Sequence, residues 1–303
     1  MKKVKKMKSY QARRHKILGY AFMAPWIIGF LVLTAWPFFY TIFLSFFNVQ
    51  YTALGWERQF MGIDNYHLAF LRSPYFVPNL IEFIIMLAIY APVITIIAFI
   101  LALLLNREIR ARGIFRALFF LPVIVMSGPV MHELMDSGGL SSIGIQNMLL
   151  LDAVSQFSMP LANALMILFE NYSVVLWFTG IPIILFISGL QKIDTGILEA
   201  ARIDSATNWQ ILWKITLPIV RPIIMVGFIL TVVQLASYTL NPILPMITEA
   251  MNDTVGGLGL ASAFAWIYAV VVLAFIGFGF VLLKGPKDEV PAAIKTRQRK
   301  WNE

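Results

Sequence analysis

The stretch EAARIDSATNWQILWKITLP, residues 199–218, is the most informative part of this 303-residue chain. It belongs to a charged region, 191–221, while the apolar segments on either side, 171–190 and 222–248, contain no charged residue. Because charged side chains are expensive in lipid, we expect this region to lie outside the membrane that its neighbours cross. A folded loop at a membrane surface is suited to binding another protein.

The loop is predicted to form two short helices around a turn. Asp194 and Thr195 can cap the first helix, and Glu199 lies in its early turns, near the positive end of the helix dipole. Asp204-Ser205 is expected to supply the turn and a second N-cap.

The second helix is expected to have an apolar side and a defined end. Ile211, Leu212 and Ile215 place apolar groups on one side of it. Leu217-Pro218 is then expected to break the helix where the chain re-enters the membrane.

The composition is that of a membrane protein with several spans. The chain is 59% hydrophobic and 13% charged, and its mean hydropathy is +0.77. Most of its charge-free runs exceed the roughly 20 residues that a helix needs to cross the hydrocarbon. We predict an all-α integral membrane protein whose six transmembrane helices lie in the runs 17–47, 83–106, 117–131, 171–191, 222–248 and 254–283. Residues 153–169 are an external interfacial helix or the outer part of the fourth span; we favour a loop to about Pro160 followed by one long helix.

The distribution of Lys and Arg predicts the orientation. The tail 1–16 carries eight of these residues, 106–116 four, 191–221 four and the tail 284–303 six, so that 22 of 24 lie on one side. The positive-inside rule then places both basic tails and the 191–221 loop in the cytoplasm, with a six-helix transmembrane domain at 17–283 between the tails. Attraction of the basic N-terminal tail to anionic membrane lipid is a commoner use of such a tail than nucleic-acid binding.

Several function classes are disfavoured by what the sequence lacks. There is no cysteine, the three histidines show no metal-ligand spacing, and no Gly-Lys dipeptide occurs that would belong to a phosphate-binding loop. The N-terminal apolar run is too long for a cleavable signal peptide. A secondary transporter would show an internal repeat or mid-span ion-relay groups, and a membrane enzyme would show clustered His, Asp or Glu. We therefore expect a transport subunit that is not itself an enzyme and that binds no cofactor or metal.

A substrate pathway needs polar groups inside apolar spans. In the fifth predicted span, Gln234, Ser237, Tyr238 and Asn241 follow i, i+3, i+4, i+7 spacing and are predicted to form one polar stripe of a helix. In the fourth span, Trp177 and Phe178 could stack on a sugar ring together with Tyr238, and Thr179 adds a hydroxyl. The alternative is that the stripe packs against a partner's span through interhelical hydrogen bonds.

The spacing Glu199-Ala200-Ala201, three residues, Ser205, nine residues, Ile215-x-Leu217-Pro218 resembles the EAA loop of ABC-importer permeases. The motifs of the first span and its loop, Tyr40, Ser45-Phe46 and Phe60-x-Gly62-x-x-Asn65-Tyr66, are similar to the carbohydrate-uptake group. So is the segment FRALFFLP at 115–122. The family has Gly where this chain has Ser205, and because serine tolerates a positive φ less well, a turn of another type is admitted here.

The resemblance implies that residues 17–283 are the permease domain of an importer in a bacterial cell membrane, and it implies a set of roles and partners. The loop would sit in a groove of an ATPase subunit, with Glu199 docking, Asp204 capping the turn and Arg202 as a polar contact. Glu199 could instead pair with Arg202 within the loop. The chain would pair with a second homologous permease, in a heterodimer more often than a homodimer. Two ATPase subunits that use ATP and Mg²⁺ and an extracellular solute-binding protein would complete the importer. The coupling residues implied are Glu199, Ala200, Ala201, Arg202, Asp204, Ser205, Ile215, Leu217 and Pro218.

The resemblance also implies a sugar or oligosaccharide as the substrate. The sugar contacts of the family's maltose-transporting members, aligned through Trp177, Gln191 and Pro222, fall on Val175, Phe178, Thr179, Gln234 and Ser237. Two of these five are apolar, which weakens the site on the fourth span. None of the charge-free segments contains Lys or Arg, which favours a neutral or weakly charged sugar unless the partner permease supplies the cation.

Overall fold

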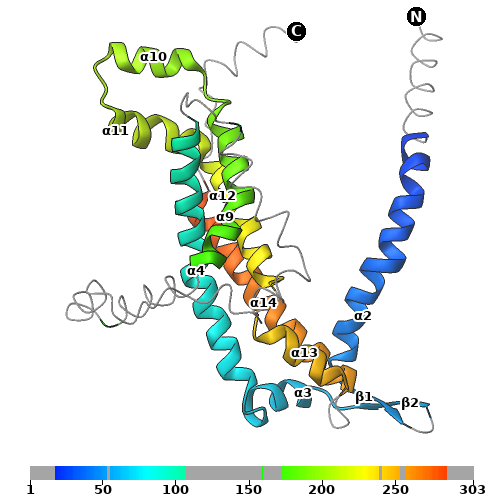
Figure 1. The fold of residues 1–303 in the computed structure, drawn as a ribbon. Helices are drawn as coiled ribbons and strands as arrows, with labels where there is room; N and C mark the ends of the chain where they lie inside the picture. Colours follow the sequence, from blue (N-terminus) through cyan, green and yellow to red (C-terminus); the bar gives the residue numbers. More distant parts are fainter. Residues whose placement is uncertain are drawn as a thin grey trace, which may run out of the picture. The chain divides into compact units, whose positions relative to one another are not determined.

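The computed structural model describes residues 18–52, 55–106, 113, 159, 172–238, 241–252 and 257–284. The predicted third span, the segment 153–169 and almost all of both basic tails lie outside these residues. The described part is mostly helical (Figure 1). It divides into two compact units, Met1–Ile81 with Pro242–Val270 and Glu82–Asn241 with Val271–Glu303.

Four helices in the described part are long and apolar enough to cross a membrane. They are Leu18–Leu44, Phe76–Leu105, Asn208–Ala236 and Gly257–Leu283. Val175–Leu190 passes the same test only together with Thr195–Ile203, from which it is bent by 68°. These helices make the chain a multi-pass membrane protein, while the count of six spans remains a prediction. The helices and strands with separate bounds are α2 Trp36–Leu44, β1 Phe47–Thr52, β2 Gly55–Phe60, α3 Asp64–His67, α4 Phe76–Leu105, α9 Tyr172–Leu190, α10 Thr195–Ile203, α11 Asn208–Ile211, α12 Leu217–Ala236, α13 Ile243–Asn252 and α14 Gly257–Leu283.

Each π-helical turn of the described part comes just before a proline. The turns are Leu31–Ala35, Leu68–Arg72 and Leu212–Thr216, and the prolines are Pro37, Pro74 and Pro218. In each turn the residue that precedes the proline donates its backbone N–H to a carbonyl five residues back. Proline has no N–H, and its ring clashes with the carbonyl four residues back. The residue just before the proline is therefore the last one that can donate an N–H to the preceding turn. The wider π turn brings the carbonyl five residues back within reach of this N–H, so its helical hydrogen bond is kept.

The fifth predicted span, 222–248, differs from the structure. The helix ends at Ala236, and α13 is a separate helix after Pro242. Pro242 cannot donate a hydrogen bond, and it biases Asn241 away from the helical conformation. The Asn241 side chain donates to the Ala236 carbonyl at 3.1 Å and thereby satisfies one of the last carbonyls of α12. A charge-free run therefore predicted the apolar length but not the helix break.

The first unit contains an element that the all-α prediction missed. Strands β1 and β2 form an antiparallel hairpin in which Phe47 pairs with Phe60. Asn65, from the motif after the hairpin, is buried and donates to the Ser45 and Phe47 carbonyls at 2.8 and 2.9 Å. The hairpin is therefore held at its base by a side-chain amide that bridges two backbone carbonyls.

Strand β1 also runs directly against the first turn of α14. Val49 forms a parallel bridge with Gly257, and a Cβ on Gly259 would overlap the Phe47 carbonyl oxygen. Only glycine lets the two backbones approach this closely.

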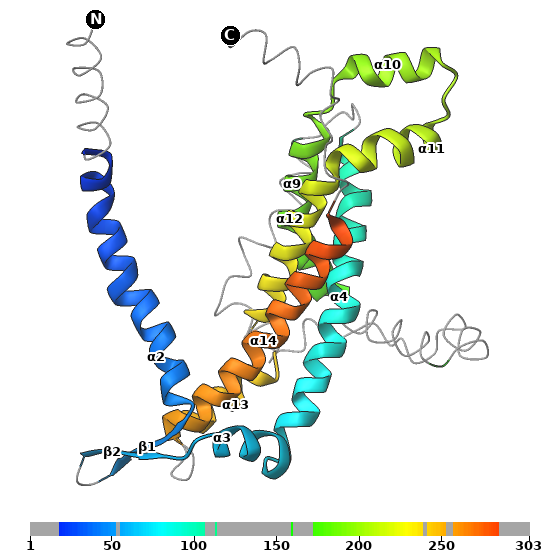
Figure 2. The ribbon, with the colours of Figure 1, turned by 180° about the vertical axis from the view of Figure 1, so that it is seen from behind.

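The second unit is built around the packing of α9 on α12. Gly227 of α12 leaves the space that the Phe186 ring of α9 fills, and Gly279 of α14 receives Phe228 in the same way. Figures 1 and 2 show α9 and α12 side by side, with α10 and α11 at one end of them. The core near this end consists of Ala98, Ala102, Leu105, Ile183, Phe186, Ile187, Leu190, Ile193, Val220 and Ile224.

Replacing Gly259 is expected to destabilise the first unit. In Gly259→Ala the new methyl group must displace the β1 backbone, which costs about 1–3 kcal/mol and lowers the melting temperature in detergent. Gly277→Ala in the same helix is the control, because a Cβ there meets nothing within 4 Å. An equal melting temperature for the two variants would show that β1 does not pack against α14 in this way.

Candidate functional site

The first helix of the 191–221 loop is capped as expected. Asp194 precedes α10, and its Oδ1 accepts a hydrogen bond from the Gly196 N–H at 2.9 Å. Ile193 belongs to the core of the second unit, and Leu198 packs against that core. Helix α10 is therefore attached at its beginning, while the rest of its surface stays available.

The turn after α10 is of the type that usually needs glycine. Ser205 has φ +61°, the left-handed conformation, so the serine does not change the type of turn. The Ser205 N–H donates to the Arg202 carbonyl at 3.0 Å, and the Ala206 N–H donates to the Ala201 carbonyl at 2.9 Å. These two bonds form a Schellman motif, whose geometry outweighs the cost of a Cβ at positive φ. Asp204 ends α10, as its proposed position at the turn requires.

The second helix has a different N-cap from the one predicted. The cap is Thr207, not Asp204-Ser205: the Thr207 hydroxyl accepts from the Gln210 N–H at 3.3 Å, and the Gln210 side chain accepts from the Thr207 N–H at 2.9 Å. This reciprocal capping box was readable in the sequence as Thr-x-x-Gln. Asp204-Ser205 cannot serve, because Ser205 and Ala206 complete the end of α10 first.

The predicted helix break at Leu217-Pro218 is wrong. Helix α11 continues through the π-helical turn Leu212–Thr216 into α12, so residues Asn208–Ala236 form one helix of 29 residues. Pro218 lies in the first turn of α12, where a missing N–H costs least because the π turn has already shifted the hydrogen bonds. Ile211 is buried and Ile215 is half-buried, which agrees with an apolar inner side of this segment.

The outer surface of the loop is both charged and apolar. Glu199, Ala200 and Arg202 are exposed, Ala201 is half-buried, and among the described residues no ion pair joins Glu199 to Arg202. Figures 1 and 2 show that α10 and α11 project sideways at the end of α9 and α12. The loop can therefore present a charge and several apolar groups to a partner. The exposed large apolar side chains of the loop, which the sequence reading did not single out, are Ile197, Ile203, Trp209, Trp213 and Ile219.

Three predicted pathway residues meet in an aromatic cluster. Tyr238 packs edge to face on Phe178 at 5.1 Å and on Trp177 at 6.0 Å between ring centroids. Trp177 and Phe178 are stacked on each other at 5.7 Å. Thr179 is buried, and its hydroxyl is already bonded to the Leu176 carbonyl. Val175 is buried as well, so the fourth span contributes rings more than polar groups.

The expected polar stripe of the fifth span is not a stripe of one helix. Gln234 is in the last turn of α12, whereas Ser237, Tyr238 and Asn241 follow its end. Ser237 is exposed, and Asn241 is buried. Among the described residues, the buried Oε1 of Gln234 and the buried hydroxyl of Tyr238 have no hydrogen-bond partner. Tyr238 also belongs to the aromatic cluster, so its hydroxyl lies at rings that can stack on a sugar. Both polar atoms are suited to bind a polyhydroxylated ligand, since an unsatisfied buried group costs about 1–3 kcal/mol.

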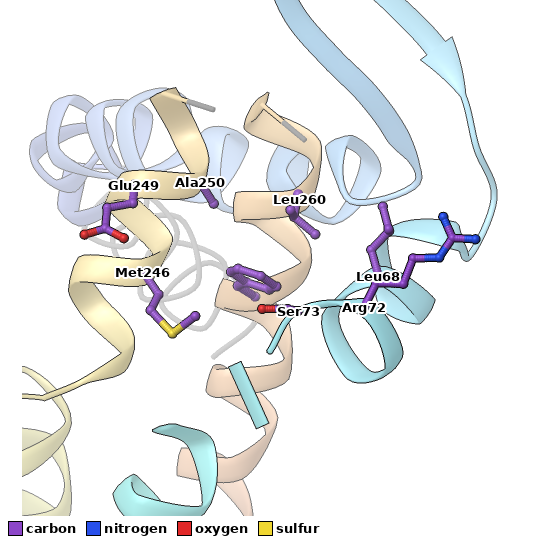
Figure 3. Close-up of a pocket in the computed structure, with 8 residues that line it drawn as sticks. Leu68, Arg72, Ser73, Met246, Glu249, Ala250 and Leu260 are labelled. Carbon is purple, nitrogen blue, oxygen red and sulfur yellow. The ribbon is translucent and has the colours of Figure 1, made fainter. Parts of the chain in front are cut away.

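The first unit contains an open hollow of about 440 Å³ that the sequence did not predict (Figure 3). Figure 3 shows Arg72 on one side of it and Glu249 on the other, with their charged ends directed away from each other. These charged groups do not converge on a common point, so we assign the hollow no role. No group of three or more His, Asp or Glu that could hold a metal ion is present in the described part of the chain. The hollow is lined by Leu68, Arg72, Ser73, Met246, Glu249, Ala250, Leu260 and Phe264.

Comparisons with known proteins give relatives of nearly the full length. The probable ABC transporter permease protein YesP of Bacillus subtilis is 30% identical over 285 residues, which cover 88% of this chain and 90% of YesP. The multiple sugar-binding transport system permease protein MsmF of Streptococcus mutans is 28% identical, with 88% and 93% covered. The lactose transport system permease protein LacF of Rhizobium radiobacter is 29% identical, with 70% of each chain covered. No family model matches the chain.

A solved structure has the same fold. A chain of a bacterial ABC transporter for import of the acidic polysaccharide alginate superposes with a TM-score of 0.60. Its sequence is 20% identical, and the match covers 91% of this chain and 98% of that one. A second structure of a bacterial alginate ABC transporter, in complex with an alginate pentasaccharide-bound periplasmic protein, gives a TM-score of 0.55 at 19% identity.

Two substitutions of Ser205 are expected to change the stability of the turn in opposite directions. Ser205→Gly removes the steric cost of a side chain at positive φ and should slow hydrogen exchange of the Ala206 amide several-fold, for a gain of about 1 kcal/mol. Ser205→Val should accelerate that exchange, because β-branched residues fit this conformation worst. Ser188→Gly within α9 is the control and should not affect this amide. Slower exchange in the valine variant would contradict the positive φ.

Proposed function

The chain belongs to the permease subunits of ABC transporters, and we propose that within this family it forms, with a second homologous permease, the membrane pathway of a sugar importer. The observation that carries this proposal is the continuous helix Asn208–Ala236. At one end it holds the second half of the 191–221 loop, here called the coupling loop, and at the other end it holds Gln234 in its last turn. A force applied to the loop therefore acts on the same helix that carries Gln234, one of the two residues whose polar atoms have no partner among the described residues.

The coupling loop is proposed to dock in a groove of an ATPase subunit. Glu199 is exposed and unpaired with Arg202, so its charge is available to a partner. Ile197 and Ile203 add exposed apolar surface on the same short helix. A helix with a central charge among apolar anchors is suited to a protein groove.

The mechanism follows from linkage between the two sites. ATP and Mg²⁺ are bound by two ATPase subunits, and closure of these subunits moves the loop. The movement shifts the central cavity from inward-facing to outward-facing, where an extracellular solute-binding protein delivers the sugar. ATP can drive this change only through different affinities for the two states. The mechanism requires the loop and both basic tails to be cytoplasmic, as the distribution of Lys and Arg predicts.

A sugar or oligosaccharide is the proposed substrate. Relatives of this chain include permeases named for multiple sugars, for lactose and for arabinooligosaccharides. The rings of Trp177, Phe178 and Tyr238 can stack on the apolar face of a sugar, and Gln234 can bond its hydroxyls. Because 172–190 and 222–238 contain no Lys or Arg, we propose a neutral or weakly charged sugar.

Loss of the Glu199 charge is expected to weaken ATPase binding. In Glu199→Ala the amount of ATPase that co-purifies with the tagged chain should fall at least about tenfold, because a charged partner group is left unpaired. Mass spectrometry of the purified complex measures the ratio of ATPase to permease.

Glu249→Ala is the matched control, because Glu249 is also an exposed glutamate but lies on α13. It should retain the ATPase. The coupling role is wrong if the Glu199 variant retains the ATPase as well, or if the wild type purifies without one.

Substitutions at the unpartnered polar atoms should separate transport from stability. Tyr238→Phe and Gln234→Leu remove atoms that have no partner in the described structure, so the melting temperature should stay the same or rise slightly. If the atoms bind the sugar, uptake of radiolabelled sugar should fall by about tenfold for each, or about 1.4 kcal/mol. Thr231→Val, which removes a buried hydroxyl already bonded to the Gly227 carbonyl and lies outside the predicted pathway, is the control for uptake. Normal uptake in both variants would place the site elsewhere.

A further inference from the structure

The two halves of the coupling loop carry different charges. Residues 191–204, which include α10, contain three acidic and two basic residues. Residues 205–221, which include α11 and the π-helical turn, contain Lys214 and Arg221 and no acidic residue. The negative charge of the loop is therefore confined to the half that carries Glu199, and the second half is purely basic.

The basic half also exposes two tryptophans. Trp209 and Trp213 are one helical turn apart, with their rings edge to face at 5.4 Å, and they are 67% and 50% exposed. Ile211 lies between them in the sequence and is buried on the other side of the segment. The pair thus forms a rigid aromatic surface that faces away from the core of its own unit, next to Lys214.

The two halves also lie at different levels. Figures 1 and 2 show α10 at the extreme end of the second unit, with α11 between α10 and the rest of α12. The segment that contains the tryptophans leads directly into the apolar helix, so it lies where the chain passes from water to hydrocarbon. Indole rings and basic side chains are the groups that favour this layer, the rings at headgroup level and the cations beside lipid phosphates.

We infer that Trp209, Trp213 and Lys214 form a lipid anchor that rests in the headgroup layer of the cytoplasmic leaflet and prefers anionic phospholipid. The acidic half of the loop is repelled by anionic headgroups and stays in water, where the ATPase is proposed to dock. The inference rests on the proposed orientation of the chain. The anchor holds the second half of the loop at the depth of the headgroups while leaving it free to move along the membrane surface, so that movement of α10 passes through the Schellman turn to α11 and α12 rather than being lost as a rocking of the whole loop.

The depth of the loop can be measured directly, because the chain contains no cysteine and single cysteines can be labelled without further changes. Spin labels are placed at Trp209→Cys and, as the matched control, at Ile203→Cys, which is 83% exposed on α10. The full-length chain, with the subunits that co-purify, is reconstituted in vesicles of phosphatidylcholine with and without phosphatidylglycerol. The label at 209 should be at least about threefold less accessible to a water-soluble nickel chelate than the label at 203, and more accessible to oxygen.

The preference for anionic lipid gives a second result. Phosphatidylglycerol should deepen the label at 209 and leave the label at 203 unchanged, and Lys214→Gln should remove this effect. Equal nickel accessibility at 209 and 203 in both kinds of vesicle overturns the anchor. So does a label at 209 that becomes protected only when the ATPase is bound, since the surface then belongs to the protein partner. Neither result bears on Glu199, so failure of the anchor is distinguishable from failure of ATPase coupling.

Discussion

The structure depends on one constraint: inside a membrane, each backbone N–H and carbonyl must find its partner within the protein. Proline breaks this rule locally, and the chain places prolines inside or just before its apolar helices. At Trp36-Pro37 and Leu217-Pro218 a π-helical turn solves the problem by moving the last bond to the carbonyl five residues back. At the other end of α12, the side chain of Asn241 bonds the Ala236 carbonyl. The helix can therefore end inside the protein without leaving all of its last carbonyls unpaired.

The 191–221 loop is folded just as completely, although it is expected to lie outside the membrane, where water could also bond its backbone. Its backbone leaves one helix and enters the next within a few residues, and the Schellman bonds and the capping box pair the donors and acceptors at both ends of the turn. The loop is stiff as a result, and it joins without interruption a helix whose far end carries Gln234. A stiff loop on a continuous helix can transmit a movement along its length, which is the property that the proposed coupling to an ATPase would need.

The candidate sites were predicted unequally well from the sequence. The position of the loop, its two helices and the Asp194 cap followed from charge and capping rules, because these act over a few residues. The polar stripe failed because Ser237 to Pro242 leaves the helical conformation, and i, i+3, i+4 spacing has no meaning beyond a helix end. Even so, Trp177, Phe178 and Tyr238 come together, since packing brought the rings into contact without that spacing.

The sequence by itself determined the membrane class, the location of four apolar helices and the resemblance to permeases of one family, and it predicted the orientation. These properties depend on hydrophobicity, on charge counts and on a motif, all of which are local or additive along the chain. Only the tertiary structure decided the positive φ of Ser205, the hairpin packed on Gly259 and the absence of partners for the Gln234 Oε1 and the Tyr238 hydroxyl among the described residues. These features arise from contacts between residues far apart in the sequence or from competition between neighbouring caps, and no single stretch of sequence records which of the competing contacts is the more stable.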